Sequence, residues 1–130
     1  MNLQINLSEE DIIGNHVVDC CFKVHKSLGP GLLEKIYETC LTHELVKLVH
    51  KVDRQVNIPI KYDGIEFKDG LRLDILVDNL VIIEVKAIDM VNPVWEAQII
   101  SQLKLTQKKL GYLVNFSVPL IKQGLRRYVN

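Results

Sequence analysis

The sequence has little that would place the protein in or across a membrane. Its longest apolar runs fall well short of the roughly eighteen residues that a spanning helix needs. The N-terminal stretch MNLQINLSEED lacks the basic and then apolar layout of a signal peptide. We therefore expect a cytoplasmic protein that makes no contact with a membrane.

Cysteine is scarce, and its spacing excludes two common kinds of small protein. The three cysteines, Cys20, Cys21 and Cys40, form neither an even disulfide framework nor a metal-binding pattern. The four histidines show no zinc-type spacing with one another or with the cysteines. We expect no disulfide scaffold and no zinc site, and we predict that the cysteines are small core residues.

Net charge is also absent, since sixteen basic residues balance sixteen acidic ones. This balance argues against a protein that coats nucleic acid by bulk electrostatics. The charge is unevenly distributed: residues 93–130 hold six basic residues and Glu96 alone, a balance of +5, so residues 1–92 carry −5. A phosphate-binding surface beside a carboxylate cluster would give this distribution, and so would an ordinary solvated face.

Apolar residues at helical spacing predict three helices, at about residues 9–27, 31–49 and 93–108. Ser8 is typical of a helix N-cap, and Gly29-Pro30 of a helix end. Pro93 suits the first turn of the third helix, whose predicted buried side holds Val94, Ala97, Ile100 or Ser101, and Leu105.

The strands are predicted between and after these helices. RQVNIPIKYDGIEF alternates apolar and polar residues and turns at Asp63-Gly64, which is a hairpin signal. LRLDILV, VIIEVKAI and GYLVNF read as three further strands, and RRYV as a short last one. With 48% hydrophobic residues and about one domain's length, the order ααβββαβ predicts an α/β or α+β domain over residues 1–130, with a mixed central sheet flanked by helices.

Three charged residues interrupt the apolar stretch RLDILVDNLVIIEVKA. Glu84 and Lys86 lie two apart on one strand, so their side chains leave the same face. Asp74 joins that face only if the connection from Asp78 to Leu80 is a three-residue loop or the ladder contains a bulge, because a two-residue turn would pair Asp74 with Ile83. A metal site built on these strands therefore requires one particular hairpin parity.

Two facing carboxylates require a cation or a proton between them. Lys86 can neutralise one charge, and a hard divalent ion such as Mg²⁺ or Mn²⁺ can neutralise the rest. A buried Asp-Lys or Glu-Lys pair without any ligand is the competing structural explanation, and the strands alone do not decide between the two.

The sequence resembles a known family at this point. Asp74 followed by Glu84-Val85-Lys86 is similar to the D…ExK signature of the PD-(D/E)xK nuclease superfamily, which has the restriction-endonuclease-like fold. GLLEKIY, with Gly31, Glu34 and Tyr37, resembles the motif that names the prokaryotic GxxExxY family within that superfamily. The resemblance extends from about Ile12 to Tyr128.

The resemblance implies a role for each matching residue. Asp74 and Glu84 match metal-binding carboxylates, the Val85 carbonyl an additional ligand, and Glu34 an acidic residue that a helix brings near the metal. Lys86 matches the lysine that positions the attacking water, and Gln98 a glutamine beside the site in exonuclease-like branches. Those branches often have tyrosine four residues later. Gln102 stands there instead, so the resemblance does not extend to their DNA-end binding.

Together these features predict a nuclease that depends on Mg²⁺ or Mn²⁺ and hydrolyses phosphodiester bonds of DNA, with RNA as the second candidate substrate. The alternative is a catalytically silent metal- or nucleic-acid-binding module on the same fold. Because a neutral chain of this size has little surface for gripping DNA, activity could require a homodimer or a protein partner. We expect Tyr37 and Trp95 to serve packing, and His25 to pack or cap near the turn before Gly31.

Overall fold

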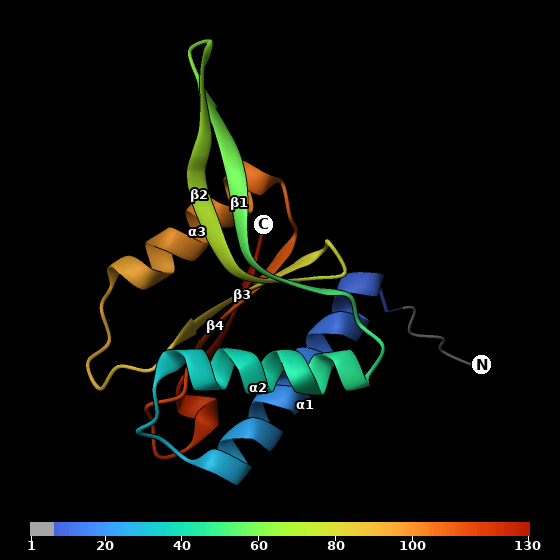
Figure 1. The fold of residues 1–130 in the computed structure, drawn as a ribbon, viewed down its shortest axis with the longest axis vertical. Helices are drawn as coiled ribbons and strands as arrows, with labels where there is room; N and C mark the ends of the chain where they lie inside the picture. The colour runs from blue at the N-terminus through green and yellow to red at the C-terminus, as the bar shows by residue number, and fades with distance from the viewer. Residues whose placement is uncertain (1–6) are drawn as a thin grey trace, which may run out of the picture.

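The computed structural model describes residues 7–130, and its elements follow the predicted order (Figure 1). After the predicted ααβββαβ order, the chain ends with a short 3-10 helix and with the short last strand that was predicted at RRYV. The elements are α1 Glu9–Leu28, α2 Glu34–Lys47, β1 Val52–Tyr62, β2 Ile65–Val77, β3 Val81–Lys86, α3 Val94–Thr106, β4 Leu110–Asn115, η1 Ile121–Gln123 and β5 Leu125–Val129. Across residues 7–130, no helix combines the length and the apolar character needed to cross a bilayer.

The five strands form one mixed sheet in the order β1-β2-β3-β4-β5. β3 and β4 are parallel, and the other three neighbouring pairs are antiparallel. α3 forms the crossover that two parallel neighbours require. The predicted class, a mixed central sheet flanked by helices, is confirmed.

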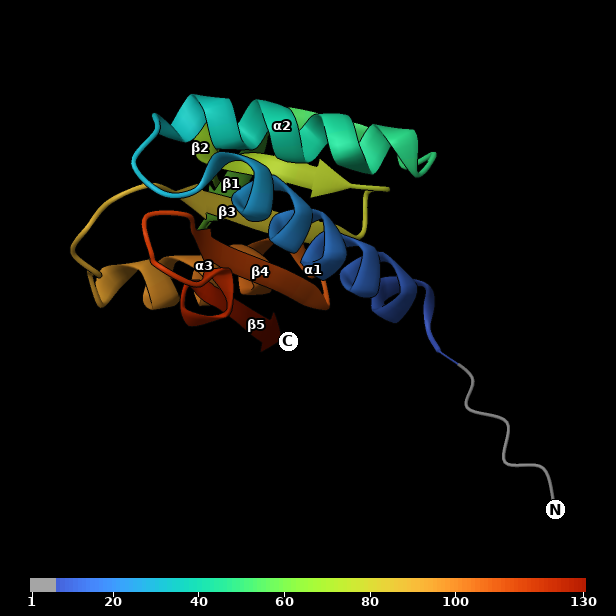
Figure 2. The ribbon, with the colours of Figure 1, turned by 90° about the horizontal axis from the view of Figure 1, so that it is seen from below.

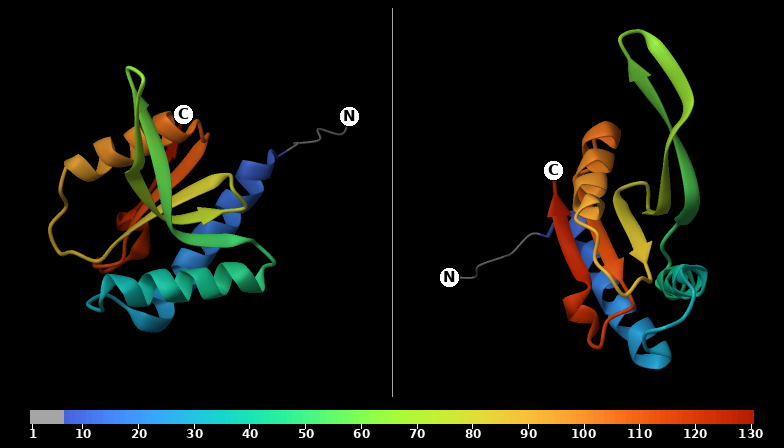
Figure 3. Two further views of the ribbon diagram at one scale, coloured as in Figure 1. Left: turned by 45° about the horizontal axis from the view of Figure 1, so that its top comes forward. Right: turned by 90° about the vertical axis from the view of Figure 1, so that its left-hand side faces the viewer.

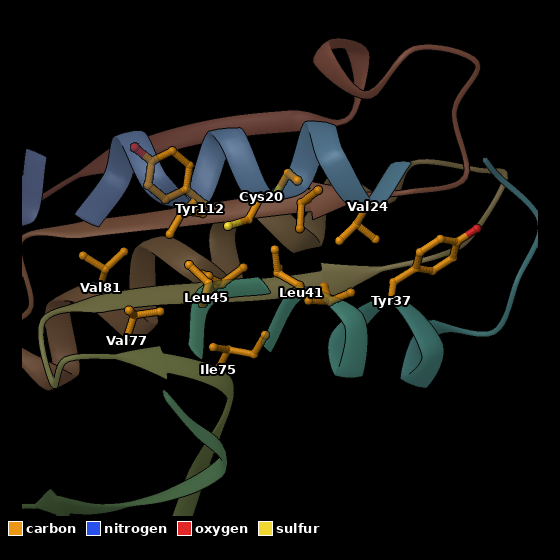
Figure 4. Close-up of a cluster of buried hydrophobic side chains, with 14 of the residues drawn as sticks. Cys20, Val24, Tyr37, Leu41, Leu45, Ile75, Val77, Val81 and Tyr112 are labelled. Carbon is orange, nitrogen blue, oxygen red and sulfur yellow. The ribbon is translucent and has the colours of Figure 1, made fainter. Parts of the chain in front are cut away.

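Helices cover both faces of the sheet (Figure 2). α1 and α2 pack on one face in the main core, which includes the pair Ile75 and Ile83 and the nearby Val85. Figure 4 shows how side chains of α1, α2 and the sheet meet there. Cys20 and Cys21 belong to this core as free thiols and Cys40 packs at its edge, so the prediction that the cysteines are core residues is confirmed. α3 packs on the opposite face, where Leu103 joins the smaller core that contains Ile82.

The first two helices differ in how closely they match their predicted bounds. α1 begins as predicted, because the Ser8 hydroxyl accepts a hydrogen bond from the Asp11 N–H (3.1 Å). α2 begins three residues later than predicted. Gly31 has φ +100°, which is incompatible with a helix, and Leu33 is the N-cap.

The predicted bounds of the third helix are close to the observed ones, but its predicted buried side is wrong. α3 buries Trp95, Ile99, Gln102 and Leu103, whereas Val94, Ile100 and Leu105 are exposed. The helix carries apolar residues on two sides, and the crossover between β3 and β4 decides which side meets the sheet. Trp95 packs with Ile99 and Leu113, as expected of a packing residue.

The β1–β2 hairpin is long and projects beyond the rest of the sheet (Figures 1 and 3). Tyr62 pairs with Ile65 around the predicted two-residue turn, and both turn residues have positive φ, +47° at Asp63 and +79° at Gly64. We call the part beyond Gln55 and Asp74, residues 56–73, the hairpin arm.

On both strands of this hairpin, the alternation of side chains between the two faces of the sheet is inverted at one rung. Gln55 and Asp74 lie between the pairs Arg54–Ile75 and Val56–Leu73, so they occupy the same rung, and Gln55 has φ +51°. Strict alternation would keep every second side chain on one face. Instead, apolar side chains below the rung pack with α1 and α2 (Val52, Ile75, Val77), and those above it pack on the α3 face (Val56, Ile58, Leu71, Leu73). Asp74 thus sits at the bend where the arm leaves the sheet.

Candidate functional site

The connection between β2 and β3 contains three residues. Val77 pairs with Val81, Leu76 with Ile82 and Ile75 with Ile83, which leaves Asp78, Asn79 and Leu80 as the loop. Asp78 and Asn79 take left-handed backbone conformations, with φ +50° and +56°. Continued by one residue, this register sets Asp74 opposite Glu84, so the hairpin has the parity that a shared carboxylate site requires.

Two hydrogen bonds from main-chain N–H groups link the Asp74 and Glu84 positions. The Asp74 N–H donates to Glu84 Oε1 (3.2 Å), and the Val85 N–H donates to Asp74 Oδ2 (2.9 Å). These bonds take the place of the regular ladder beyond the Ile75–Ile83 pair. They fix both carboxyl groups and leave the second oxygen of each for another partner.

The electrostatics of this pair favour a bound proton or cation. Burial raises the pKa of Glu84, and the neighbouring Asp74 carboxylate raises it further, to about 8. Only 7% of Glu84 is exposed, so water screens the repulsion between the two acids poorly. Glu84 therefore holds a proton near neutral pH when no cation is present.

Glu34, the first residue of α2, interacts electrostatically with Asp74 of this pair. Burial raises the pKa of Glu34, Asp74 raises it further, and Lys86 lowers it. Each effect requires proximity, so the structure brings the predicted helix acid into the electrostatic field of the two strand residues.

The turn before α2 is held in place by Tyr37. Its hydroxyl donates to the Gly29 carbonyl (2.5 Å) and accepts from the Leu32 N–H (3.1 Å). Its buried ring stacks on Phe116, with centroids 4.5 Å apart and the planes 2° from parallel. As Figure 4 shows, the Tyr37 hydroxyl points away from the core towards this turn. Tyr37 is therefore a structural residue, as expected, and it fixes where Glu34 begins the helix.

Lys86 ends β3 on the same side of the strand as Glu84. Its ammonium group lies 5.5 Å from the centroid of the Trp95 ring. Within residues 7–130 it forms no ion pair, although its charge lowers the pKa of both Glu34 and Glu84. A half-buried lysine held by an aromatic ring and facing acids is available to bind an anion.

Gln98 lies on the outer side of α3, in a hollow of about 480 Å³ that Glu84 also lines. The structure thus brings five of the predicted positions to the open end of β3: Asp74, Glu84, Val85, Lys86 and Gln98. The catalytic and metal-binding roles of these residues, of Glu34 and of the Val85 carbonyl stay predictions.

The donor set fits a hard divalent cation. Within residues 7–130, no three His, Cys, Asp or Glu side chains are gathered closely enough to hold a metal by themselves. Mg²⁺, however, usually binds one or two carboxylates and keeps several waters. The Asp74 and Glu84 pair satisfies that requirement, and burial together with the Asp74 carboxylate raises the pKa of Glu84 although Lys86 acts in the opposite direction.

Sequence reasoning missed a second polar cluster next to Glu34. The buried Glu38 accepts hydrogen bonds from the Arg54 guanidinium (2.8 Å) and from the Gln55 side-chain amide (2.7 Å). Glu34 and Glu38 are one helical turn apart, so their shared face was readable from the sequence. The partners on β1 were not, because the left-handed residue Gln55 reverses the alternation there.

Three of the histidines form hydrogen bonds with groups other than Asp74 and Glu84. His25 Nε2 donates to the Val118 carbonyl (2.9 Å) and the ring packs near Phe116, so His25 packs as expected. On the other side, His16 and His50 are hydrogen bonded (2.7 Å), and His50 bonds Asp78 of the β2–β3 loop (2.6 Å). This chain ties α1 to the loop that sets the hairpin register.

Comparison with known families gives one match over most of the chain. The model of the PD-(D/E)XK nuclease superfamily matches residues 11–128. Comparisons with curated proteins and with solved structures give no match. Residues 11–128 include both strand acids, the lysine and the flanking helices, and the chain belongs to the PD-(D/E)XK nuclease superfamily.

Proposed function

We propose that the protein is a nuclease that depends on a divalent metal and hydrolyses phosphodiester bonds of DNA, with RNA as the second candidate substrate. The observation that carries this proposal is the Asp74–Glu84 pair, since two mostly buried acids are held together by main-chain N–H groups and, within residues 7–130, neither forms an ion pair with a basic side chain. A pair with only a structural purpose would be more stable with a basic partner in contact. Membership of a nuclease superfamily supports the same conclusion.

Each proposed role follows from chemistry at a stated position. Asp74 and Glu84 would hold Mg²⁺ or Mn²⁺ through their free oxygens, with the Val85 carbonyl and Glu34 as further donors. The cation, when bound, supplies the positive charge that activates water and neutralises the scissile phosphate. Lys86 orients the attacking water and stabilises negative charge that develops on the phosphoryl oxygens. Gln98 donates or accepts a hydrogen bond at the edge of the same hollow.

We also propose membership of the GxxExxY family. Gly31 supplies the left-handed turn, Glu34 starts the helix at the site and Tyr37 fixes the turn, so the three motif residues act as one unit. We infer a single cytoplasmic domain that acts alone, as a homodimer or with a protein partner.

The second candidate is a catalytically silent binding module on the same fold. The observation that favours it is the absence, among residues 7–130, of a third acidic side chain in direct contact with the pair. Such a module would bind metal through Asp74 and Glu84 without cleaving nucleic acid.

The decisive experiment is a digestion series with Mg²⁺, Mn²⁺ or EDTA on supercoiled DNA, linear duplex DNA, single-stranded DNA and RNA. Lys86→Ala, Glu84→Gln and Asp74→Ala should abolish cleavage. Lys26→Ala, which removes an exposed lysine of α1 that does not line the hollow beside Glu84, should leave cleavage unchanged. Melting curves of every variant separate lost chemistry from lost folding. Equal cleavage by the wild type and Lys86→Ala would reveal contamination and overturn the nuclease proposal, and metal binding without cleavage would support the silent module.

A further inference from the structure

Two hollows lie along α3, one beside Glu84 and one farther out beside the hairpin arm. The inner hollow, about 480 Å³, lies between Leu71–Arg72 of β2 and the side of α3 that carries Gln98 and Gln102. The outer hollow, also about 480 Å³, lies between the hairpin arm at Phe67–Lys68 and Leu105 of α3. Residues of β2 and α3 line both hollows, β1 adds residues 59–61 to the outer one, and β3 adds Glu84 to the inner one. The two hollows therefore follow one another along β2 and α3 from Glu84 towards the hairpin tip, and we call them together the arm groove.

Among the apolar residues that line this groove, only Leu71 packs against a core. Val94, Ala97 and Leu105 form the stripe of α3 that the sequence suggested would be buried, and they line the groove instead. Phe67 on the arm is 49% exposed and faces the same channel. In Figure 3 (right) the arm extends beyond α3. Side chains of both the arm and α3 line the groove.

A buried polar atom in the groove lacks a partner. Gln102 is 6% exposed, it lines the inner hollow, and its Oε1 has no hydrogen-bond partner in the described part of the chain. An unsatisfied buried amide costs about 1 to 3 kcal/mol, so such a group points to a ligand that supplies the missing bond.

The charges of the groove are complementary to phosphate. On the arm, Glu66 is paired with Lys61 (3.2 Å). Lys68 and Arg72 also line the groove, and neither meets a carboxylate within residues 7–130. Arg72 shares the inner hollow with Glu84, and a guanidinium beside a metal-binding acid suits a phosphate that bridges them.

We propose that the arm groove binds the substrate as a single polynucleotide strand, with Arg72 on the phosphate beside Glu84, Phe67 stacked on a base and Gln102 bonded to a base edge. A cationic groove with an aromatic side chain is how proteins hold unpaired strands. A duplex is stiff over about 150 base pairs and is gripped through many phosphate contacts, which this neutral chain does not offer. Only a flexible strand can bring a phosphate down to Glu84, which is almost fully buried.

This inference rests on the proposed function only in taking a polynucleotide as the ligand. Its test measures binding and requires no cleavage. Fluorescence anisotropy in EDTA would compare labelled oligo-dT and oligo-U of about twelve nucleotides with a duplex of equal length. We expect at least one single strand to bind about tenfold or more tightly than the duplex, and the two oligomers distinguish DNA from RNA.

Three variants test the assigned contacts. Arg72→Ala should weaken binding and lower the slope of log affinity against log salt by about 0.7, the value for one phosphate contact on a single strand. Phe67→Ala should weaken binding about fivefold or more, with partial rescue by Phe67→Trp. Gln102→Leu should weaken binding while the melting temperature stays equal or rises, a combination that a structural role would not produce. Lys26→Ala, outside the groove, is the matched charge control.

The outcomes separate this inference from the nuclease proposal. Single-strand binding without any cleavage in Mg²⁺ or Mn²⁺ would overturn the nuclease proposal and support the groove. Equal affinity for duplex and single strand, or unchanged affinity of folded Arg72→Ala and Gln102→Leu, would overturn the groove assignment. A dimer in sedimentation that Phe67→Ala dissociates, with nucleic-acid binding unchanged, would identify the groove as a contact between two copies and overturn it as well.

Discussion

Glu84 accepts a hydrogen bond from the Asp74 backbone, while Asp74 accepts one from the residue that follows Glu84. The two acids are therefore positioned by main-chain groups and not by a basic side chain. A salt bridge would neutralise them, whereas these bonds fix their place and leave their repulsion intact. The pair is consequently preorganised for whichever positive charge arrives, a proton or a metal ion.

The first prediction concerns the stability of the metal-free protein as a function of pH. Glu84 has a pKa of about 8 in the folded chain against an ordinary value of 4.5. The native state holds this proton more tightly than the unfolded state, so the stabilisation is complete below about pH 4.5 and is lost as the pH rises through 8. Melting temperatures in EDTA should fall between pH 5 and pH 9. Glu84→Gln, which cannot ionise, should flatten that decrease, and an equal decrease in the variant would contradict the assignment.

Divalent cations should reverse this loss. Mn²⁺ or Mg²⁺ takes the place of the proton on Glu84, so binding stabilises the native state and releases protons. We expect the melting temperature to rise with added Mn²⁺, and binding to tighten as the pH increases from 6 to 8. Calorimetry in buffers of different ionisation enthalpy would measure the proton release. Asp74→Ala should show neither effect, and a wild type that also shows neither would contradict a metal centre.

Tyr37→Phe should destabilise the protein by about 1 to 3 kcal/mol, because the Gly29 carbonyl and the Leu32 N–H lose their partner. The ring remains stacked on Phe116, so little cavity is created. Urea denaturation measures the change. We expect cleavage to decrease as well, since the turn positions Glu34. Tyr62→Phe, on an exposed tyrosine of the hairpin arm, is the matched control. Equal stability of Tyr37→Phe and Tyr62→Phe would show that the hydroxyl has no structural role.

Glu38→Ala should lower the free energy of unfolding by about 2 to 4 kcal/mol, because it leaves Arg54 and Gln55 without their buried acceptor. Chemical denaturation would give the value. Glu44→Ala is the control in the same helix, since Glu44 pairs with the exposed side chains of Lys23 and Lys47 and accepts no hydrogen bond from β1. A loss at Glu38 no larger than that at Glu44 would contradict a structural role for the Glu38 cluster.

Asp78→Ala tests the loop that sets the register. Asp78 accepts from His50 (2.6 Å) and from the Lys51 N–H (2.8 Å), and its φ of +50° suits Asp or Asn better than Ala. We expect a loss of about 1 to 3 kcal/mol and weaker metal binding, because the turn fixes Asp74 opposite Glu84. Asp78→Asn, which keeps an acceptor and tolerates this backbone, should lose less. Metal affinity equal to that of the wild type in Asp78→Ala would separate the loop from the site.

Local sequence signals account for much of the fold. Ser8, Gly29 and the Asp63-Gly64 turn act within a few residues, so α1 and the arm turn could be predicted closely. Whether Asp74 faces Glu84 could be stated only as a condition. It depends on whether the β2–β3 loop contains three residues or two, and the sequence does not decide between these lengths.

Features that depend on distant pairing could not be predicted. α3 has apolar residues on two sides, and periodicity alone does not show that Ile99 meets the sheet while Val94 faces a groove. The inversion at Gln55 has no local signal, since glutamine rarely adopts a left-handed conformation. The sequence shows Arg72 only as a charged residue two positions before Asp74. That Arg72 lines the same hollow as Glu84 depends on the bend at Asp74, which the sequence does not predict.

The rung formed by Gln55 and Asp74 also separates two parts of the molecule that can change independently. Below it, the register is fixed by the buried side chains that hold Glu84. Above it, the two antiparallel strands pair with each other, and the base of the arm packs on the α3 face. Adding or removing two residues per strand within the arm preserves which side chains face inwards. Arm length is thus a variable that evolution or a designer can adjust to the size of a substrate, with the carboxylate pair left where it is.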